Sequence, residues 1–346
     1  MTKRRLRLTG TAVLLALMMF ACSDGSGDDD AGAGGGSTDT TRAGGSVASG
    51  ETVRIAFSAP GADHGWLAAI TENAREEADR LGDVELILLE GTNDSAAQVS
   101  QVEQLIAQKP DALIILPHEG GPLTPIALRA MNAGIPVVNV DREFDSSAAY
   151  RTWIGGDNYG IGVSAGHFFA QELNCQGNVV EIQGIAGISV TQARTAGFAD
   201  SIKDLCGDGI KVVAQQPADF VPDKGLTVME TILQQHSDID AVYTHDDDMA
   251  MGVVSAIENA GRQDQMFLTG AGGSTAAMDL IAKGGLYRAT FLYNPSMSAS
   301  AVRIARLIAR GEGFDELVEP GVPSYIQMPA TTVTSANVAS VRELGF

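Results

Sequence analysis

Short apolar runs alternate with longer amphipathic stretches along the chain from residue 52 onward. The apolar runs are rich in β-branched residues, which predicts strands. The stretches between them, such as 66–82 and 96–108, carry apolar residues at every third or fourth position, which predicts helices. Strands that alternate with helices in this way predict parallel sheets covered by helices. The strands predicted in the first half are 52–59, 84–90, 111–117, 135–141 and 151–156.

The second half repeats this order of elements. "DALIIL" at 111 matches "DAVYTH" at 240, and "IPVVNV" at 135 matches "QMFLTG" at 265, so similar elements recur about 130 residues apart. We therefore expect two similar α/β lobes, each with its own sheet, for which 346 residues are ample. Ligands of open parallel sheets bind beyond the carboxyl ends of the strands. The strands predicted in the second half are 178–184, 211–216, 240–245, 266–272 and 287–293.

The amino-terminal segment has the pattern of an export signal. Four basic residues within residues 3–7 precede an apolar run that is too short to span a membrane and that ends at Ala21 and Cys22. The segment resembles a bacterial lipoprotein signal, although Met19 stands where such signals usually have leucine. We expect a signal peptide over 1–21, lipidation of Cys22 and a flexible tether over 22–50, with the fold beginning near Thr52. Ordinary cleavage to a soluble secreted product is the alternative.

The charge of the chain argues against two classes of partner. Without residues 1–21 the chain has 19 basic and 43 acidic residues, a net charge of −24. So acidic a surface disfavours nucleic acid and anionic lipid as partners.

Cys175 and Cys206 each follow a predicted helix that leads into a strand. An even number of cysteines in an exported protein favours a disulfide over two free buried thiols.

Candidate binding residues follow the predicted strands. Asp141 and Arg142 can accept and donate charge-assisted hydrogen bonds, each worth about 1.5–3 kcal/mol, or the pair bridges only its own lobe. Trp66 and Phe220 occupy matching places in the two lobes, where their rings either stack on a polyhydroxylated ligand or belong to the core.

Other polar clusters do not form a catalytic or metal motif. His64 and His118 lack the further ligands of a zinc site, and the aspartates 246–248 lack the spacing of a calcium loop. We expect one of these three aspartates to face the cleft and the others to cap the following helix. The stretch "LTGAGGSTAAMDLI" has neither the last glycine nor the lysine of a phosphate loop. No nucleophile motif is present either, so we expect a binding protein without cofactor or metal.

The segments "EIQGIAGISVTQARTAGF", "QQPADF" and "DAVYTHDDDMAMG" carry a family resemblance. Through them the chain resembles the periplasmic sugar-binding proteins of the ribose-binding type, the type I solute-binding proteins of ABC importers. The resemblance implies two Rossmann-like lobes with parallel sheets, a three-stranded hinge and a ligand cleft between the lobes. The chain crossings then fall near Gly156, Tyr293 and 322–330. The implied lobes are 51–156 plus 295–325 and 157–294 plus 326–346.

The resemblance also implies the site. Asp141, Arg142, Arg194, Phe220 and Trp66 match sugar-binding positions, whereas other family positions differ in this chain. Two asparagines and a glutamine are replaced by His64, Asp246 and Tyr293. Leu116 replaces another asparagine, and His118 or Glu119 would then take over the polar role of that asparagine. Gly272 stands where the family has an aspartate, so backbone N–H groups or a water would replace that carboxylate. The candidate ligand-binding residues are His64, Trp66, His118, Glu119, Asp141, Arg142, Arg194, Phe220, Asp246, Gly272 and Tyr293.

These expectations combine into one functional hypothesis. The chain is predicted to be a monomeric, lipid-anchored receptor at the outer face of the cytoplasmic membrane. It would deliver a small carbohydrate or polyol, either a pentose or a sugar alcohol, to an ABC permease with its ATPase. A sugar or autoinducer receptor for a signalling partner would use the same cleft, and a dinucleotide-dependent enzyme is the second alternative.

Overall fold

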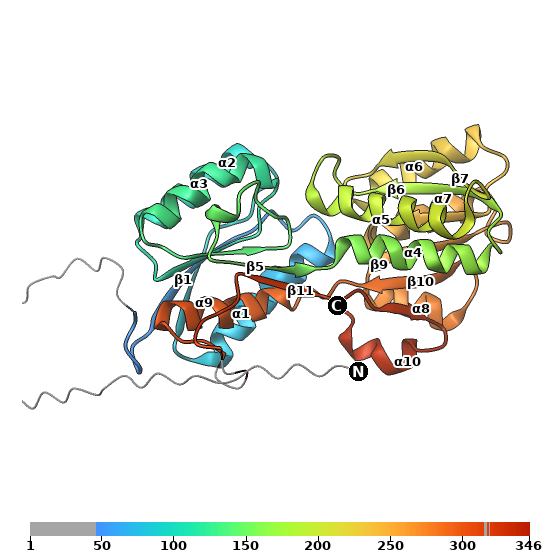
Figure 1. Cartoon of the computed structure of the whole chain (residues 1–346). Coiled ribbons are helices and arrows are strands. Elements are labelled where there is room, and N and C mark those ends of the chain that lie inside the picture. The colour runs from blue at the N-terminus through green and yellow to red at the C-terminus, as the bar shows by residue number, and fades with distance from the viewer. Residues whose placement is uncertain (1–45, 315–316, 318) are drawn as a thin grey trace, which may run out of the picture. The chain divides into compact units, whose positions relative to one another are not determined.

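Two six-stranded sheets, each covered by helices on both faces, form the folded part of the chain (Figure 1). The computed structural model describes residues 46–314, 317 and 319–346. Both sheets lie within one structural unit, Ala43–Phe346. The predicted signal peptide and Cys22 lie outside the described residues, as does most of the predicted tether.

The first lobe is built on a fully parallel sheet in the order β11-β5-β4-β3-β1-β2. Helices α1 and α9 pack together on one face, and α2 and α3 on the other (Figure 1). Its strands are β1 Val53–Ser58, β2 Val84–Leu88, β3 Ala112–Ile115, β4 Val137–Val140, β5 Thr152–Gly156 and β11 Tyr325–Met328. Its helices are α1 Gly65–Leu81, α2 Ser95–Ala107, α3 Gly120–Asn132 and α9 Met297–Arg310, with a 3-10 turn at Ser147–Ala149.

The second lobe repeats this topology in the order β12-β10-β9-β8-β6-β7, with β12 antiparallel to β10. The two halves of the chain therefore use equivalent strands in equivalent positions, which confirms the predicted recurrence. Its strands are β6 Gly177–Gln183, β7 Ile210–Pro217, β8 Ala241–Thr244, β9 Phe267–Gly272, β10 Tyr287–Leu292 and β12 Thr332–Thr334. Its helices are α4 Asn158–Glu172, α5 Ser189–Cys206, α6 Pro222–Gln235, α7 Asp247–Asn259, α8 Thr275–Lys283 and α10 Val338–Val341, followed by a 3-10 turn at Arg342–Leu344.

The central strands are buried on both faces. In β3, Ile114 packs in the same cluster as residues of α1 and α9, whereas its neighbours Leu113 and Ile115 pack with residues of α2 and α3. All three side chains are fully buried. This burial explains why the strands are continuous apolar runs in the sequence rather than alternating ones.

The chain passes between the lobes three times. The first passage follows β5 at Gly156, the second follows β10 at residues 293–296, and the third lies between β11 and β12 at residues 329–331. The structure differs from the expected lobe boundary at 325/326, because β11 pairs with β5 as far as Met328. The edge strands β11 and β12 were not predicted, since most of their residues are only partly buried and they do not form apolar runs.

The fold also begins earlier than expected. Val47 is only 3% exposed, and its N–H donates to the carbonyl oxygen of Ala309, 2.8 Å away. Arg310 donates to the carbonyl oxygens of Ala48 and Glu51. The boundary placed near Thr52 was therefore wrong by about five residues, because one buried valine among small polar residues gives no periodic signal.

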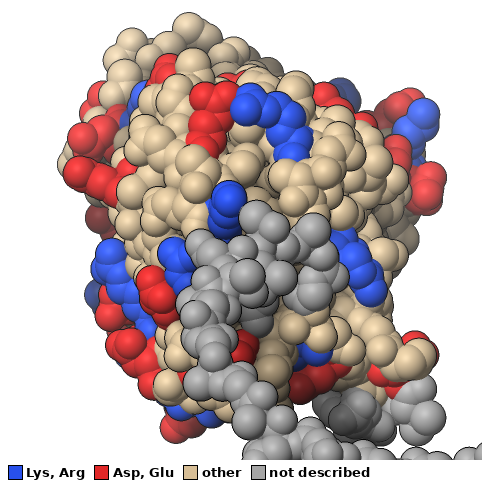
Figure 2. All heavy atoms as spheres, turned by 90° about the vertical axis from the view of Figure 1, so that its left-hand side faces the viewer, with Lys and Arg blue, Asp and Glu red and all other residues tan. Residues whose placement is uncertain are grey.

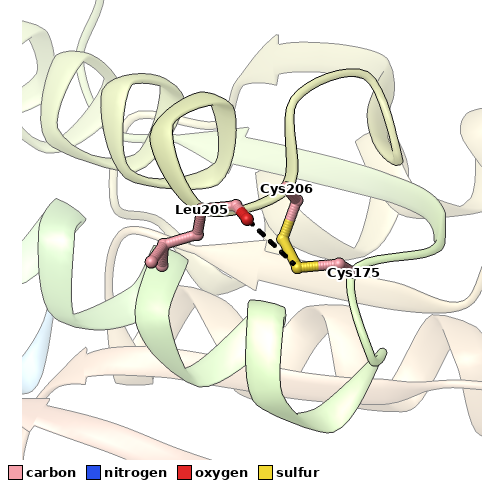
Figure 3. Close-up of a disulfide and its surroundings, with 3 residues drawn as sticks. All are labelled: Cys175, Leu205 and Cys206. Carbon is pink, nitrogen blue, oxygen red and sulfur yellow. Dashed lines mark hydrogen bonds between the residues drawn. A yellow bond between two sulfur atoms is a disulfide. The ribbon is translucent and has the colours of Figure 1, made fainter.

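Cys175 and Cys206 form a disulfide in the second lobe, with their Cα atoms 5.0 Å apart (Figure 3). Its sulfur atoms lie beside the backbone carbonyl of Leu205, whose oxygen is 3.7 Å from Cys175 Sγ. The two cysteines precede β6 and β7, so the disulfide lies at the amino ends of these strands. It links the ends of α4 and α5 at the edge of the sheet opposite to the one where ligands bind.

Ion pairs fix α9 to the rest of the first lobe. Glu77 on α1 binds Arg80 and Arg303, and Asp83 binds Arg306 and Arg310. Figure 2 shows the outer end of this lobe, where acidic and basic side chains are interspersed.

Within the described part of the chain, no helix is both long enough and apolar enough to span a membrane.

Candidate functional site

A cavity lies where the carboxyl ends of the strands of both sheets meet. The cavity is lined by His64, Trp66, Asp141, Arg142, Val190, Arg194, Phe220, Asp246, Ala271, Gly272 and Tyr293. Nine of the eleven predicted residues are among them, and both lobes contribute. Their role in ligand binding remains a prediction.

Two of the predicted residues do not line the cavity. The carbonyl oxygen of His118 accepts a hydrogen bond from Arg142 Nη1 at 2.8 Å, and its N–H donates to Gln98, so this residue lies behind the guanidinium group. Glu119 is exposed and directly precedes α3. The turn after β3 therefore presents carbonyl groups to Arg142 instead of the side chains that we expected.

Two lining residues were not predicted. Val190 lies in the first turn of α5, and Ala271 lies near the end of β9. Their positions after β6 and on β9 could have pointed to them, but apolar side chains carry no chemical signal that separates cavity from core.

Asp141 and Arg142 are both buried, with 4% and 3% exposure. Asp141 has a left-handed backbone, with φ 61°, and its carbonyl oxygen accepts from Trp153 Nε1 at 3.0 Å. Arg142 Nη1 is used within its own lobe, on the His118 carbonyl, whereas Nε has no hydrogen-bond partner among the described residues and lies 3.9 Å from Asp141 Oδ2. Burial raises the pKa of Asp141, and the neighbouring Arg142 opposes that rise. Arg142 Nη1 thus holds the loop after β3, whereas Arg142 Nε remains available to a ligand.

A chain of hydrogen bonds joins the two lobes through the crossings. The Tyr293 hydroxyl donates to Asp141 Oδ1, and Asn158 Nδ2 donates to the Tyr293 oxygen at 3.2 Å. Arg194 Nε donates to Asn158 Oδ1 at 2.9 Å, and the Arg194 guanidinium lies 4.9 Å from the centre of the Tyr293 ring. The Arg194 Nη1 also donates to the carbonyl of His245. Asn158 was missed by the sequence analysis, although its place directly after a crossing strand could have indicated it.

Aromatic rings cover two sides of the cavity. Trp66 stacks on Tyr293 with ring centres 5.5 Å apart, and its Nε1 donates to the Tyr293 carbonyl at 2.7 Å. Phe220 comes from the second lobe, and its ring centre lies 6.1 Å from that of His64 and 6.0 Å from Arg142 Cζ. Phe220 has φ 66°, a conformation that is strained for a bulky residue and that clusters at functional sites. Apolar faces for a flat ligand are therefore present in both lobes.

His64 and Asp246 belong to opposite lobes, and each shifts the pKa of the other. His64 Nδ1 lies 2.6 Å from Asp63 Oδ1; although burial lowers the pKa of His64, Asp63 and Asp246 raise it above its usual value. Asp246 Oδ1 accepts the N–H of Met249 at 2.8 Å and caps α7. Burial raises the pKa of Asp246 to about 7. This carboxyl group can therefore accept or donate a hydrogen bond near neutral pH.

The other two aspartates do not cap α7 as expected. Asp247 is fully buried, and its Oδ2 accepts the N–H groups of Gly273 and Ser274, each at 2.7 Å. These backbone groups are thus already occupied and do not replace the missing family carboxylate. Asp248 faces the other lobe, where its Oδ2 lies 3.3 Å from the backbone nitrogen of Trp66. The expectation that these aspartates cap α7 and the expectation that backbone N–H groups near Gly272 are free were therefore both wrong. In each case the partners lie far away in the sequence.

Gly272 itself has φ 132°, a conformation that side chains rarely adopt. A Cβ atom at this position would lie 3.5 Å from Asp247 Oδ2 and from the ring of Phe346. The loss of the carboxylate is therefore accompanied by a backbone conformation that suits glycine.

Among residues 46–314, 317 and 319–346, no group of three or more histidine, cysteine, aspartate or glutamate residues is placed to hold a metal ion.

Comparisons with known proteins find that the chain is similar to solute-binding proteins. Residues 55–313 match the periplasmic binding protein domain. The ribose import binding protein of Bacillus subtilis (strain 168) is 36% identical over 197 residues, which cover 57% of this chain and 63% of that protein, less than two thirds of its length. The galactofuranose-binding protein of Escherichia coli (strain K12) is 35% identical over 222 residues, covering 62% of this chain and 69% of that protein.

A solved structure extends the similarity to the whole fold. The solute binding protein of an ABC transporter from Bacillus halodurans C-125, with bound myo-inositol, matches with a TM-score of 0.78 at 27% identity. The match covers 86% of this chain and 100% of that one. The three similar proteins are thus named for or bound to different small polyhydroxylated molecules.

Proposed function

We propose that this chain, which belongs to the periplasmic binding protein domain family, is an extracytoplasmic receptor that delivers a small carbohydrate to an ABC permease with its ATPase. The observation that carries the proposal is the composition of the cavity between the lobes. Carboxylates, guanidinium groups and aromatic rings from both lobes converge there. Such a site binds a neutral molecule with many hydroxyl groups and requires no chemical step.

The energy of binding can come from a few contacts. Asp141 and Asp246 can accept hydrogen bonds from hydroxyl groups, and Arg142 and Arg194 can donate hydrogen bonds to hydroxyl oxygens. Each charge-assisted hydrogen bond contributes about 1.5–3 kcal/mol, and a micromolar dissociation constant needs about −8 kcal/mol. Three or four such bonds together with ring stacking reach this value after ordering costs. A ligand held by both lobes also favours the closed arrangement over the open one.

A pentose or a sugar alcohol is the ligand class that fits best. The cavity is small, and the rings of Trp66 and Tyr293 occupy part of the space around it. Gly272 provides no carboxylate, whereas Asp246 adds one, so the hydroxyl pattern recognised differs from that of ribose-binding sites. The similar proteins are named for or bound to ribose, galactofuranose and myo-inositol, which supports a small polyhydroxylated ligand.

The proposal includes a lipid anchor on Cys22, preceded by a signal peptide over 1–21. Support comes from the sequence pattern alone, since these residues lie outside the described part. Mass spectrometry of the mature protein from membranes would detect an acylated Cys22. A Cys22→Ala variant should be released from the membrane fraction.

Isothermal titration calorimetry against a panel of aldoses and polyols tests the ligand class. We expect micromolar binding of at least one pentose other than ribose, or of one sugar alcohol. Asp141→Asn should weaken this binding at least tenfold, while Asp200→Asn, a surface change at a residue paired with Tyr159, should not. Binding of ribose alone would contradict the ligand class, and no binding of any carbohydrate would contradict the proposed function. Loss of uptake of the bound sugar in a deletion strain would support the importer role.

A further inference from the structure

The amino end of α1 meets a carboxylate from the opposite lobe. His64, the first residue before α1, provides no side-chain hydrogen bond to the free N–H groups of this helix. The N–H of Trp66 instead donates to Asp248 Oδ2 at 3.3 Å, and Asp248 belongs to the first turn of α7 in the second lobe. Both Asp248 carboxylate oxygens also lie close to Gly65, since a Cβ atom there would be 3.1 and 3.3 Å from them.

This contact has a favourable electrostatic basis. The first N–H groups of a helix are unpaired within the helix and carry partial positive charge, so a carboxylate near them is stabilising. α1 has 17 residues, and its first turn contains no acidic residue of its own. The protonated form of His64, which Asp248 favours together with Asp63 and Asp246, adds positive charge at the same place. Asp248 therefore supplies the negative charge that stabilises the amino end of α1 and that the first turn of α1 lacks.

Asp248 does not line the cavity, so this contribution does not come from ligand contact. We propose that Asp248 is a positioning residue that stabilises the closed arrangement of the two lobes by capping α1. The proposal rests on the proposed function, in which the ligand binds between closed lobes. Because α1 and α7 belong to different lobes, the contact is made only when the lobes approach each other, and opening exposes both groups to water.

The size of the effect follows from the population of closed molecules. Apparent affinity falls in proportion to the fraction of protein in the binding-competent state. A carboxylate at a helix amino end contributes enough to change that population by roughly two- to fivefold. Other contacts join the lobes independently, such as the Glu143 N–H that donates to Ser189 Oγ at 3.3 Å and the bond between Tyr293 and Asp141. Loss of Asp248 should therefore weaken closure rather than abolish it.

The first test compares Asp248→Ala with Asp223→Ala. Asp223 is a matched control because it is an acidic residue in the first turn of another helix of the same lobe, α6, and it is exposed. Calorimetry with D-ribose, L-arabinose and myo-inositol should show that Asp248→Ala raises the dissociation constant of every sugar that binds by the same factor, roughly two- to fivefold. Asp223→Ala should leave these constants unchanged. A factor that differs between sugars would mean that Asp248 acts through the ligand and would overturn the proposal.

The second test uses Gly65→Ala. The added methyl group would meet Asp248 at 3.1 Å in the closed arrangement, whereas alanine is favoured over glycine in a free helix. The variant should therefore bind each sugar more weakly while its unliganded form is at least as stable to heat as the wild type. In the Asp248→Ala background the same change should have no effect on binding, because the carboxylate that crowds the added methyl group is gone. An equal loss of affinity in both backgrounds would contradict the proposal.

A third measurement does not depend on any ligand. Small-angle X-ray scattering of the unliganded protein should give a larger radius of gyration for Asp248→Ala and Gly65→Ala than for the wild type and Asp223→Ala. If no sugar in the panel binds, the proposed function fails, and the role of Asp248 is still decided by this measurement. An unchanged radius of gyration in both variants would overturn the proposal for Asp248.

Discussion

The hydroxyl group of Tyr293 donates a hydrogen bond to the carboxylate of Asp141, so that a residue at the second chain crossing holds a cavity-lining residue of the first lobe. The same hydroxyl accepts from Asn158, which lies directly after the first crossing. Two of the three crossings are thus linked to the cavity by side chains. The bond therefore fixes the position of the Asp141 carboxylate at the cavity.

Tyr293→Phe is expected to lower the free energy of unfolding by about 1–3 kcal/mol, because the buried Asp141 carboxylate loses a hydrogen-bond donor. The aromatic ring keeps its contacts with Trp66 and Arg194, so the loss reports on the hydroxyl group. Urea unfolding of the unliganded protein measures it.

Tyr159→Phe is the matched control for this prediction. The Tyr159 hydroxyl also donates to a carboxylate, that of Asp200 at 3.1 Å, but Tyr159 is 46% exposed. Water can replace a bond at the surface, so the loss should stay within about 0.5 kcal/mol. Equal losses in the two variants would contradict the importance of the buried bond.

Asp246 should make the stability of the unliganded protein depend on pH. Burial raises its pKa from 3.8 to about 7, so the folded protein keeps a proton that the unfolded chain loses. The resulting stabilisation is present below pH 4 and is lost as the pH rises to 7, by about 4 kcal/mol at most. The raised pKa of His64, to which Asp246 contributes, acts in the same direction.

Thermal melting of the wild type and of Asp246→Asn from pH 4 to pH 8 tests this expectation. The melting temperature of the wild type minus that of the variant should fall between pH 4 and pH 7 and then level off. A constant difference across this range would show that Asp246 titrates at its ordinary pKa in the folded protein.

Glu77 should show the opposite dependence on pH. Its hydrogen bonds to Arg80 and Arg303 lower its pKa from 4.5 to about 2, so its stabilisation is present above pH 4.5 and lost as the pH falls to 2. Glu77→Gln should cost about 1–2 kcal/mol at pH 7, a value reduced by solvent screening at the two arginines, which are more than half exposed. Chemical unfolding at pH 7 and pH 3 measures the difference.

Glu72→Gln serves as the comparison on the same helix. Glu72 lies 3.9 Å from Arg75, and both side chains are more than half exposed. An exposed pair of this kind contributes about 0.5 kcal/mol or less. A loss in Glu77→Gln no greater than that in Glu72→Gln would refute the structural role of Glu77 between α1 and α9.

Gly272→Asp, which restores the family carboxylate, is expected to destabilise the protein instead of creating a ribose site. The backbone there has φ 132°, and side chains in such a conformation cost about 1–3 kcal/mol. The new Cβ atom would lie 3.5 Å from the buried carboxylate of Asp247. Gly272→Ala separates the two causes, because it adds the backbone strain without the charge. A variant as stable as the wild type that binds ribose more tightly would contradict this account.

Much of the fold and of the cavity could be predicted from the sequence. Strands of parallel sheets are buried on both faces, so they appear as apolar runs, and chain order then fixes which residues follow each strand. Residues such as Asp141, Arg194 and Phe220 were found on this ground, with the family resemblance. His118 was misplaced because the same rule selects a position and not the direction in which its side chain points.

The sequence by itself determined the two-lobe architecture and the kinds of side chain at the cleft, because both depend on local patterns and on the order of elements. Only the tertiary structure decided the partners of those side chains. Asp247 holds the turn at Gly273, Asp248 reaches α1, and Tyr293 reaches Asp141. Each of these pairs joins segments far apart in the chain, and two of them exist only where the lobes or their crossings meet. Pairing of that kind is set by the packing of whole elements, which no local pattern in the sequence encodes.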